Sequence, residues 1–375
     1  MSVRFTSTLL AVVVVATLTS PLAGATPAES LTPLPRLIEG AGTGFAVSYS
    51  TVDEHGRPTV AKGQIYLPAG TAPEGGWPVV SWAKGTVGVG DACAMNSTLD
   101  AGTEDPMAVE LSKPLLSQLL RSGSAVVSSD YIGLGTPDAH HYLNATSEAR
   151  AVIDIVGAAA DALPALSRTW VAAGHSQGGA AALTAAATAN SYGAPSDFRG
   201  VVAFAPASNI EDVLPLLGPA LPRIPQLDGV TATLIYILFG LKDSRPDLDV
   251  DSYLSDLGRE YVASAEDRCI VDLREAVDGV APQQLLSRPL SDPAMAAALR
   301  EYMAVPTTGY TEPVVIEEGL ADTVVPPVGA TALAAQLLAG GAQDVTYRPI
   351  PGATHYDIIA ETVDDAAPRI ATMLR

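Results

Sequence analysis

The sequence has few of the residues that would indicate several common classes of protein. Basic residues are scarce: 21 Lys and Arg stand against 41 Asp and Glu, and the net charge is −20. So acidic a chain argues against nucleic acid or anionic lipid head groups as partners and favours neutral substrates. No stretch reaches the ~20 consecutive apolar residues that a membrane-spanning helix needs. We therefore expect no stable membrane insertion, and at most transient contact with a lipid interface.

Motifs for metal or nucleotide cofactors are also missing. The sequence contains no HExxH, no paired CxxC and no phosphate-binding GxxxxGK[ST] motif. His140 and His141 are adjacent, but a loop pair without a third spaced ligand is more typical of solvated or pocket-lining residues than of a metal site. We therefore expect a protein that works without a metal ion or an organic cofactor.

The N-terminus has the pattern of an export signal. An apolar run, Leu9–Leu18, follows Arg4 and precedes the small residues Ala23–Ala25. This arrangement is typical of a secretory signal peptide, here residues 1–25, which is removed by cleavage near Ala25. The mature protein is expected outside the cell.

Cysteine is nearly absent as well. The two cysteines are Cys93 and Cys269. An even number in an exported chain favours one disulfide, and two separate buried thiols are the alternative.

Beyond the signal, hydrophobic periodicity alternates between that of strands and that of helices. The chain opens with a predicted hairpin, and later strands alternate with helices, which implies a mostly parallel sheet flanked by helices. The expected strands are 45–52, 60–67, 78–83, 125–129, 170–173, 200–205, 313–317 and 345–348. The expected helices are 107–121, 147–163, 180–189, 328–338 and 356–374.

Residues 207–311 interrupt this alternation. They are rich in Leu, Pro and Asp and are helical in places, without a rhythm of strands. We interpret them as a mainly helical cap inserted between two parts of one α/β core, residues 26–206 and 312–375. The apolar run Val230–Leu241 in this insert is expected either to line an apolar pocket or to form a buried cap helix.

One motif carries specific chemistry. Gly174–Gly179 read GHSQGG between an apolar run and an alanine-rich run. In a strand-to-helix turn, GxSxG holds its serine in a strained conformation, with small neighbours that leave the Oγ accessible. We interpret Ser176 as a nucleophile and the backbone N–H of Gln177 as a donor to a substrate oxyanion. A glycine-rich turn that merely contains a serine is the alternative.

A serine nucleophile needs a base and an orienting carboxylate, which in this architecture follow it in the order acid, base. His355 is the one histidine after His175, and it lies in a loop before the last predicted helix. Asp322 follows a predicted strand through a short turn, at the same edge of the sheet. The alternatives are a helix cap for Asp322 and a solvated loop position for His355. Weaker candidates for the acid are Glu317, Glu318 and Asp344.

The source of a second oxyanion donor stays open between two loops. Lys84–Thr86 follows one predicted strand, and Asp130–Gly133 follows another. Either loop can present backbone N–H groups at the edge of the sheet, and either can be a plain turn that contains glycine.

Four motifs in this order resemble the secretory lipase family of α/β-hydrolases, the lipase A type. They are SSDYIGLG around Asp130, GHSQGG around Ser176, GLADTVVP around Asp322 and GATHYD around His355. The resemblance implies an α/β-hydrolase fold, a triad of Ser176, Asp322 and His355, and a small-molecule or lipid ester as substrate. It also implies a helical cap with a lid or tunnel for an acyl chain.

The resemblance further implies a role for Asp130 in the oxyanion hole. Because an ionised carboxylate would repel an oxyanion, Asp130 would have to donate through its backbone N–H or keep its side chain protonated. Similar proteins also bridge the region of Cys93 to the cap, which fits a bond between Cys93 and Cys269.

The sequence thus predicts an exported serine hydrolase, most similar to a triacylglycerol lipase or carboxylesterase, that works through an acyl-enzyme. A serine peptidase or an acyltransferase on the same fold is the first alternative, because the fold does not choose the leaving group. The second is a non-catalytic binding protein, which would be expected to lack a member of the triad.

Overall fold

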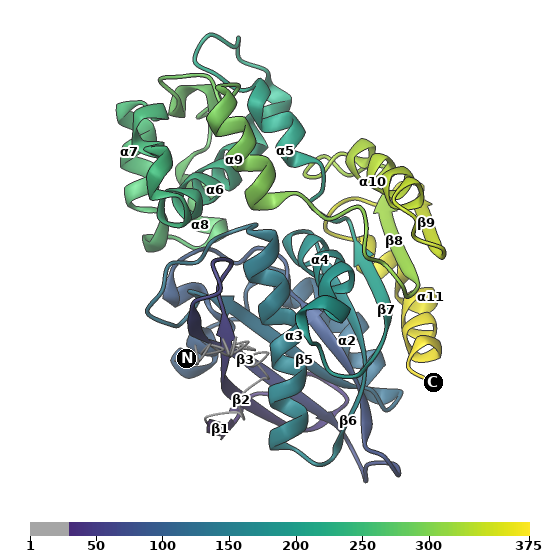
Figure 1. The fold of residues 1–375 in the computed structure, drawn as a ribbon. Helices are drawn as coiled ribbons and strands as arrows, with labels where there is room; N and C mark the ends of the chain where they lie inside the picture. Colours follow the sequence, from purple (N-terminus) through teal and green to yellow (C-terminus); the bar gives the residue numbers. More distant parts are fainter. Residues whose placement is uncertain (1–29) are drawn as a thin grey trace, which may run out of the picture.

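The computed structural model describes residues 30–375, so the predicted signal peptide, 1–25, lies outside the described residues. The described chain forms a nine-stranded sheet with helices on both faces (Figure 1). Its strands are β1 (Ser30–Pro33), β2 (Ala41–Val52), β3 (Pro58–Pro68), β4 (Trp77–Ala83), β5 (Ala125–Ile132), β6 (Leu166–His175), β7 (Asp197–Phe204), β8 (Val314–Gly319) and β9 (Val345–Ile350). Its helices are α1 (Met95–Ala101), α2 (Met107–Arg121), α3 (Ala145–Ala162), α4 (Gln177–Tyr192), α5 (Ile210–Val213), α6 (Thr231–Ser244), α7 (Asp256–Ala263), α8 (Ile270–Ala276), α9 (Pro293–Met303), α10 (Pro327–Ala339) and α11 (Ile358–Met373).

The sheet is mostly parallel, as predicted. Its strand order is β1-β2-β3-β5-β4-β6-β7-β8-β9. The strands β1, β2, β3 and β5 pair antiparallel with one another in that order, and every later pair, from β5–β4 to β8–β9, is parallel. The predicted opening hairpin is β2 and β3. The order brings the carboxyl ends of β4, β6, β7 and β8 side by side, at the edge where the predicted site residues lie.

The central strands are buried on both faces. In β4, Val79 and Ala83 join the core that contains residues of α3 and α4, while Val80 and Trp82 join the core that contains residues of α2 and α11. Successive strand residues point to opposite faces, so a strand covered on both sides is apolar along its whole length. This is why these strands are visible in the sequence as continuous apolar runs.

Between β7 and β8 the chain leaves the sheet and forms helices α5 to α9, which lie beyond the carboxyl ends of the strands (Figure 1). The helix α6 is buried on nearly all sides, which favours the buried-helix interpretation of Val230–Leu241. A Cβ atom on Gly240 of α6 would lie 2.9 Å from the Cα atom of His141 in the core. The insert therefore packs directly against the loop that follows β5.

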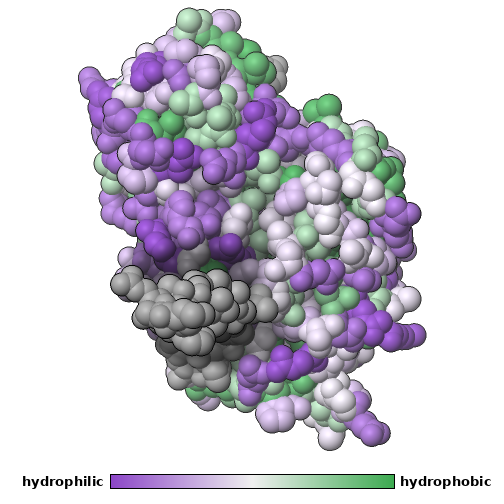
Figure 2. Space-filling model, viewed as in Figure 1, coloured by the Kyte–Doolittle hydropathy of each residue, from purple (hydrophilic) through white to green (hydrophobic). Residues whose placement is uncertain are grey.

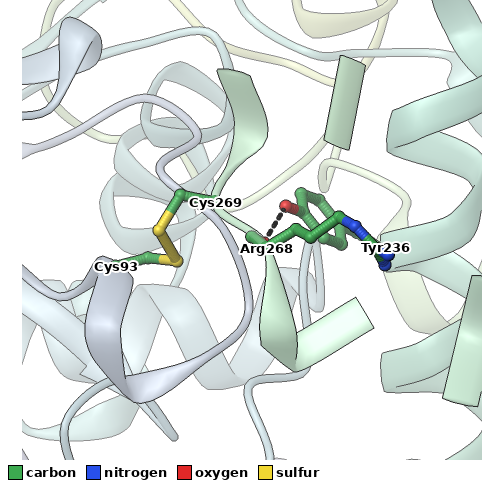
Figure 3. The surroundings of a disulfide bond; sticks show 4 residues. All are labelled: Cys93, Tyr236, Arg268 and Cys269. Atoms are coloured by element: carbon green, nitrogen blue, oxygen red, sulfur yellow. Dashed lines mark hydrogen bonds between the residues drawn. A yellow bond between two sulfur atoms is a disulfide. The ribbon is translucent and has the colours of Figure 1, made fainter. Parts of the chain in front are cut away.

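The disulfide predicted from the two cysteines is present. Cys93 lies in a short 3-10 helix, Asp91–Cys93, and Cys269 immediately precedes α8 in the insert (Figure 3). Their Cα atoms are 5.5 Å apart, and the bond spans 176 residues of sequence. Beside it, the N–H of Ile270 donates to the carbonyl of Val87 over 2.9 Å. The bond and this contact together hold the insert to the segment that follows β4.

In Figure 2, hydrophilic and apolar residues are interspersed over the visible face, on the insert and on the core alike. Large exposed apolar side chains occur in both parts, including Val213 and Leu216 in the insert and Leu320 and Val328 in the core. Among residues 30–375, no helix combines the length and the apolar character that crossing a bilayer requires.

Candidate active site

Ser176 lies in a sharp turn between β6 and α4. Its φ and ψ are 56° and −118°, a conformation that costs a residue with a side chain on the order of 1–3 kcal/mol. Backbone hydrogen bonds maintain this conformation. The N–H of Ser176 donates to the carbonyl oxygen of Phe204 over 2.9 Å, and the carbonyl oxygen of Ser176 accepts from the N–H of Ala207 over 3.1 Å. The end of the neighbouring strand β7 therefore holds the turn.

The glycines of the motif are required by packing. A Cβ atom on Gly178 would lie 1.9 Å from the carbonyl oxygen of Ala83, and one on Gly174 would lie 2.2 Å from the carbonyl oxygen of Gly178. No side chain fits at either position, because real Cβ atoms do not approach backbone so closely. This tight packing is what lets α4 start directly at the end of β6.

The structure brings Ser176, His355 and Asp322 together. The Nε2 of His355 lies 2.9 Å from the Oγ of Ser176, and its Nδ1 lies 2.6 Å from Oδ2 of Asp322. Because a carboxylate accepts, Nδ1 carries the proton and Nε2 is free to accept one from the serine. His355 and Asp322 are buried, and Ser176 is half-buried.

Asp322 is fixed independently of the histidine. Its Oδ1 accepts from the backbone N–H groups of Val324 and Val325, over 2.7 and 2.8 Å. One carboxylate oxygen is thus held by the turn before α10, and the other meets the imidazole. Asp322 does not act as a helix cap, because the N-cap of α10 is Pro326 and receives no side-chain hydrogen bond.

The weaker candidates for the acid have other surroundings. Glu317 pairs with Arg348 of the neighbouring strand, over 2.8 Å. Glu318 is fully buried, and neither of its carboxylate oxygens has a hydrogen-bond partner within residues 30–375. Burial raises the pKa of Glu318 to about 8, and the negative charge of Asp322 contributes. The carbonyl of Asp344 accepts from the N–H of Val314 at the start of β8, at the opposite end of that strand from Asp322.

His175 was not identified from the sequence as part of the site. It is buried, and its Nε2 lies 2.9 Å from the backbone carbonyl of His355, which only accepts, so Nε2–H is the donor. Burial lowers the pKa of His175 to about 3, with a further contribution from His355, and the ring is therefore neutral. Its position directly before the serine is the one signal in the sequence that points to it.

The candidate donors for an oxyanion lie on two segments that touch at this turn. Gln177 is the first residue of α4, where backbone N–H groups have no partner within the helix. β4 is the neighbour of β6, and a Cβ atom on Gly85, just after β4, would lie 3.2 Å from Nδ1 of His175. β5 is one strand further away. The strand order thus favours the Lys84–Thr86 loop over Asp130–Gly133. Asp130–Gly133 is also not the loop that the sequence predicts, because β5 extends to Ile132.

The expectation that the side chain of Asp130 serves the oxyanion hole is not supported. Its carboxylate is fully buried and lies 2.8 Å from Nζ of Lys84. Its remaining contacts are with Nε2 of Gln64 at 2.9 Å and with the N–H groups of Met95 and Asn96 at 3.1 and 3.2 Å. These four donors occupy both oxygens of the carboxylate, Oδ1 through Lys84 and Met95 and Oδ2 through Gln64 and Asn96. Asp130 instead compensates the charge of Lys84. Burial lowers the pKa of Lys84, and the nearby carboxylate of Asp130 opposes this effect.

The adjacent histidines have different partners. His140 is fully buried beside Gln177, with Nε2 3.1 Å from the amide nitrogen of that residue. His141 lies between two carboxylates, Glu54 at 2.8 Å and Asp243 of α6 at 2.9 Å, which raise its pKa against the opposing effect of burial. No cluster of His, Cys, Asp and Glu within the described residues is arranged to hold a metal ion.

Comparison with known proteins matches residues 100–371 to the secretory lipase family. The chain belongs to this family. It is accordingly a carboxylic ester hydrolase, and the family name and the disulfide both fit a secreted protein. A search of curated proteins gives no match.

Solved structures show the same α/β-hydrolase fold. Lipase A of Candida antarctica in its closed state is 18% identical, with a TM-score of 0.73 over 93% of this chain and 86% of that chain. The rice cell wall degrading esterase LipA of Xanthomonas oryzae is 19% identical, with a TM-score of 0.66 over 88% of each chain. A putative hydrolase of Legionella pneumophila is 17% identical, with a TM-score of 0.66 over 89% of each chain.

Proposed function

We propose that this member of the secretory lipase family hydrolyses neutral carboxylic esters through a triad of Ser176, His355 and Asp322. The observation that carries the proposal is the continuous chain of contacts from the Ser176 Oγ to His355 and on to Asp322, at 2.9 and 2.6 Å. These are hydrogen-bond distances suited to proton transfer from a nucleophile to a base.

In the first step, His355 takes the proton of Ser176 as the Oγ attacks the ester carbonyl. Asp322 keeps Nδ1–H of the imidazole in place and offsets the positive charge that the ring acquires. The same proton then passes from His355 to the leaving alcohol, and an acyl-enzyme is left on Ser176. A water molecule, deprotonated by His355, releases the acid and restores the serine.

For the tetrahedral oxyanion we propose two donors, the backbone N–H of Gln177 and one from the Lys84–Thr86 loop. One such donor typically contributes about 3 kcal/mol to transition-state stability. The short distance between this loop and the turn at Ser176 supports the assignment, whereas the ion pair of Asp130 with Lys84 gives Asp130 an indirect role.

We further propose that residues 207–311 act as a cap on a core made of 26–206 and 312–375, and that the protein is exported with cleavage near Ala25. The scarcity of positive charge suits a neutral lipid or small ester better than a phosphorylated or nucleic-acid substrate. Triacylglycerols and short dispersed esters are both in this class.

A series of p-nitrophenyl esters from acetate to oleate, assayed on wild type and Ser176→Ala, tests this function. Wild type should turn over several of them, Ser176→Ala should lose nearly all activity, and a fluorophosphonate probe should label wild type at Ser176 alone. Faster cleavage of matched peptide amides than of esters would point to a peptidase instead. Unchanged turnover in Ser176→Ala would show that the proposed triad does not catalyse the reaction.

A further inference from the structure

We propose that His140 and Glu148 are positioning residues that hold the oxyanion donor Gln177 through its side chain. This inference rests on the proposed function and adds two residues to it. Gln177 begins α4 directly after the nucleophile, and its side chain is buried rather than directed at solvent. The amide nitrogen of this side chain lies 2.6 Å from Oε1 of Glu148 and 3.1 Å from Nε2 of His140.

The protonation of His140 follows from its other contact. Its Nδ1 lies 2.9 Å from the carbonyl oxygen of Ile132, which only accepts, so Nδ1 carries the proton and Nε2 accepts. The ring also stacks on Tyr131, with ring centroids 5.7 Å apart and planes inclined by 12°. Burial lowers the pKa of His140 to about 3, and the ring is therefore a neutral, fixed acceptor for one hydrogen of the Gln177 amide.

Glu148 receives the second hydrogen. It lies in the first turn of α3, and its Oε1 also accepts from the N–H of Leu143 over 2.8 Å. Leu143 has a φ of 61°, so this contact holds a strained position just before the helix. Both hydrogens of the Gln177 amide thus have assigned acceptors on the loop and helix that follow β5.

The consequence for catalysis lies in the geometry of one residue. The backbone N–H proposed to meet the oxyanion and the side chain held by this cluster belong to the same Cα atom. If the side chain were released, the first turn of α4 would gain freedom at the position where an oxyanion donor has to be fixed in advance. Catalysis depends on such prior organisation, because a donor that must reorient during the reaction contributes less.

Other ionisable groups face the cluster. Lys84 acts electrostatically on both His140 and Glu148, and His141 acts on His140. Burial of Glu148 raises its pKa to about 8, while the contacts with Gln177 and Leu143 and the charge of Lys84 oppose this. Below that pH the carboxyl group is neutral. Above it, a negative charge appears beneath the proposed oxyanion hole and should disfavour the oxyanion.

A double-mutant cycle on the full-length mature enzyme tests the inference, with a soluble p-nitrophenyl ester as substrate. Glu148→Ala and Gln177→Ala should each lower kcat by ~10- to 100-fold and change KM by less than about 2-fold. This is less than the roughly 100- to 1,000-fold typical of losing a whole oxyanion donor, because the backbone N–H is still present in both variants. Because both act on one donor, the double variant should be no slower than the worse single variant. Losses that multiply would overturn the proposal.

Conservative variants separate positioning from folding. Glu148→Gln keeps an acceptor for Gln177, so it should retain kcat within about 3-fold at pH 7 and should lack the decline of kcat that we expect of wild type above pH ~8. His140→Phe keeps a ring on Tyr131 and removes the acceptor, so it should lower kcat even if Glu148→Ala does not fold. Wild-type kcat in His140→Phe, or equal loss in the Gln and Ala variants of Glu148, would contradict the inference.

Asp154→Ala is the matched control, because Asp154 is another buried carboxyl of α3 and binds Thr51 and Tyr192 instead of Gln177. It should lower stability and leave kcat within about 2-fold of wild type. A loss of kcat in this control equal to that in Glu148→Ala would mean that any disturbance of α3 suffices, and the proposal would fail. Failure of the triad itself appears separately, as turnover that survives in Ser176→Ala.

Discussion

His175 holds the backbone of His355 through a hydrogen bond of 2.9 Å from its Nε2 to the carbonyl oxygen of His355. The two rings are also close, with centroids 4.7 Å apart and planes inclined by 45°. The residue before the proposed nucleophile therefore supports the loop that carries the proposed base. This hydrogen bond adds to the contact between His355 and Ser176 in joining two parts of the site that lie about 180 residues apart in sequence.

Replacing His175 should therefore impair the base without removing it. In His175→Phe the carbonyl of His355 loses its donor inside the protein, which costs about 1–3 kcal/mol of stability. We expect kcat to fall by roughly 10-fold because the imidazole is less firmly placed relative to Ser176. Thermal unfolding and steady-state kinetics measure the two effects. His175→Gln retains a donor and serves as control, and a Phe variant with wild-type kcat would show that the contact has no role in the reaction.

The disulfide is expected to matter for activity as well as for stability. For a loop of this length, the chain-entropy model predicts that the Cys93–Cys269 bond contributes about 5 kcal/mol, and measured values often fall below such estimates. The bond also fixes the segment that follows the Lys84–Thr86 loop, through the contact of Ile270 with Val87.

The double variant Cys93→Ser, Cys269→Ser should thus unfold at lower temperature and have a lower kcat. Adding a reductant to wild type should reproduce both effects. The reductant should change neither quantity in the double variant, which has no disulfide and therefore controls for other effects of the reductant. A fall in stability with unchanged kcat would show that the bond holds the insert without holding the proposed oxyanion loop.

The ion pair of Asp130 with Lys84 leads to a different expectation from a catalytic role of the Asp130 side chain. Removing one partner of a buried pair leaves the other charge uncompensated and typically costs about 3–5 kcal/mol. Asp130→Ala and Asp130→Asn should therefore both be strongly destabilised in denaturant unfolding. The double variant that combines Lys84→Met with Asp130→Leu should recover part of the lost stability, because it leaves no buried charge without a partner. A stable Asp130→Asn that had lost only turnover would return Asp130 to the oxyanion hole.

Much of this arrangement can be predicted from the sequence, for identifiable reasons. The central strands are apolar along their length because both faces are covered, and GHSQGG requires glycines where backbone meets backbone. His355 is predicted by elimination, because no other histidine follows His175. Asp322 is predicted by its place after β8, at the edge of the sheet that Ser176 shares.

The environments of buried polar side chains were not predictable in the same way. The role of Asp130 depends on the order β5-β4-β6, which places β5 one strand away from the nucleophile and brings Lys84 next to the aspartate. Neither the strand order nor a contact across 46 residues is visible in local patterns. The contacts of Gln177 with His140 and Glu148 depend likewise on how α3 packs against α4.

Glu318 should make the stability of the protein depend on pH. Burial raises its pKa to about 8 in the folded state, whereas a glutamate in an unfolded chain titrates near pH ~4.3. As pH rises from about 4.5 to about 8, the unfolded state releases this proton first and is favoured, so the contribution of Glu318 to stability is present below this window and is lost across it. Glu318→Gln cannot titrate. Its stability relative to wild type should therefore improve steadily between pH 4.5 and 8 and level off above, in denaturant unfolding at a series of pH values. A difference that stays constant across this window would show that Glu318 is ionised in the folded protein.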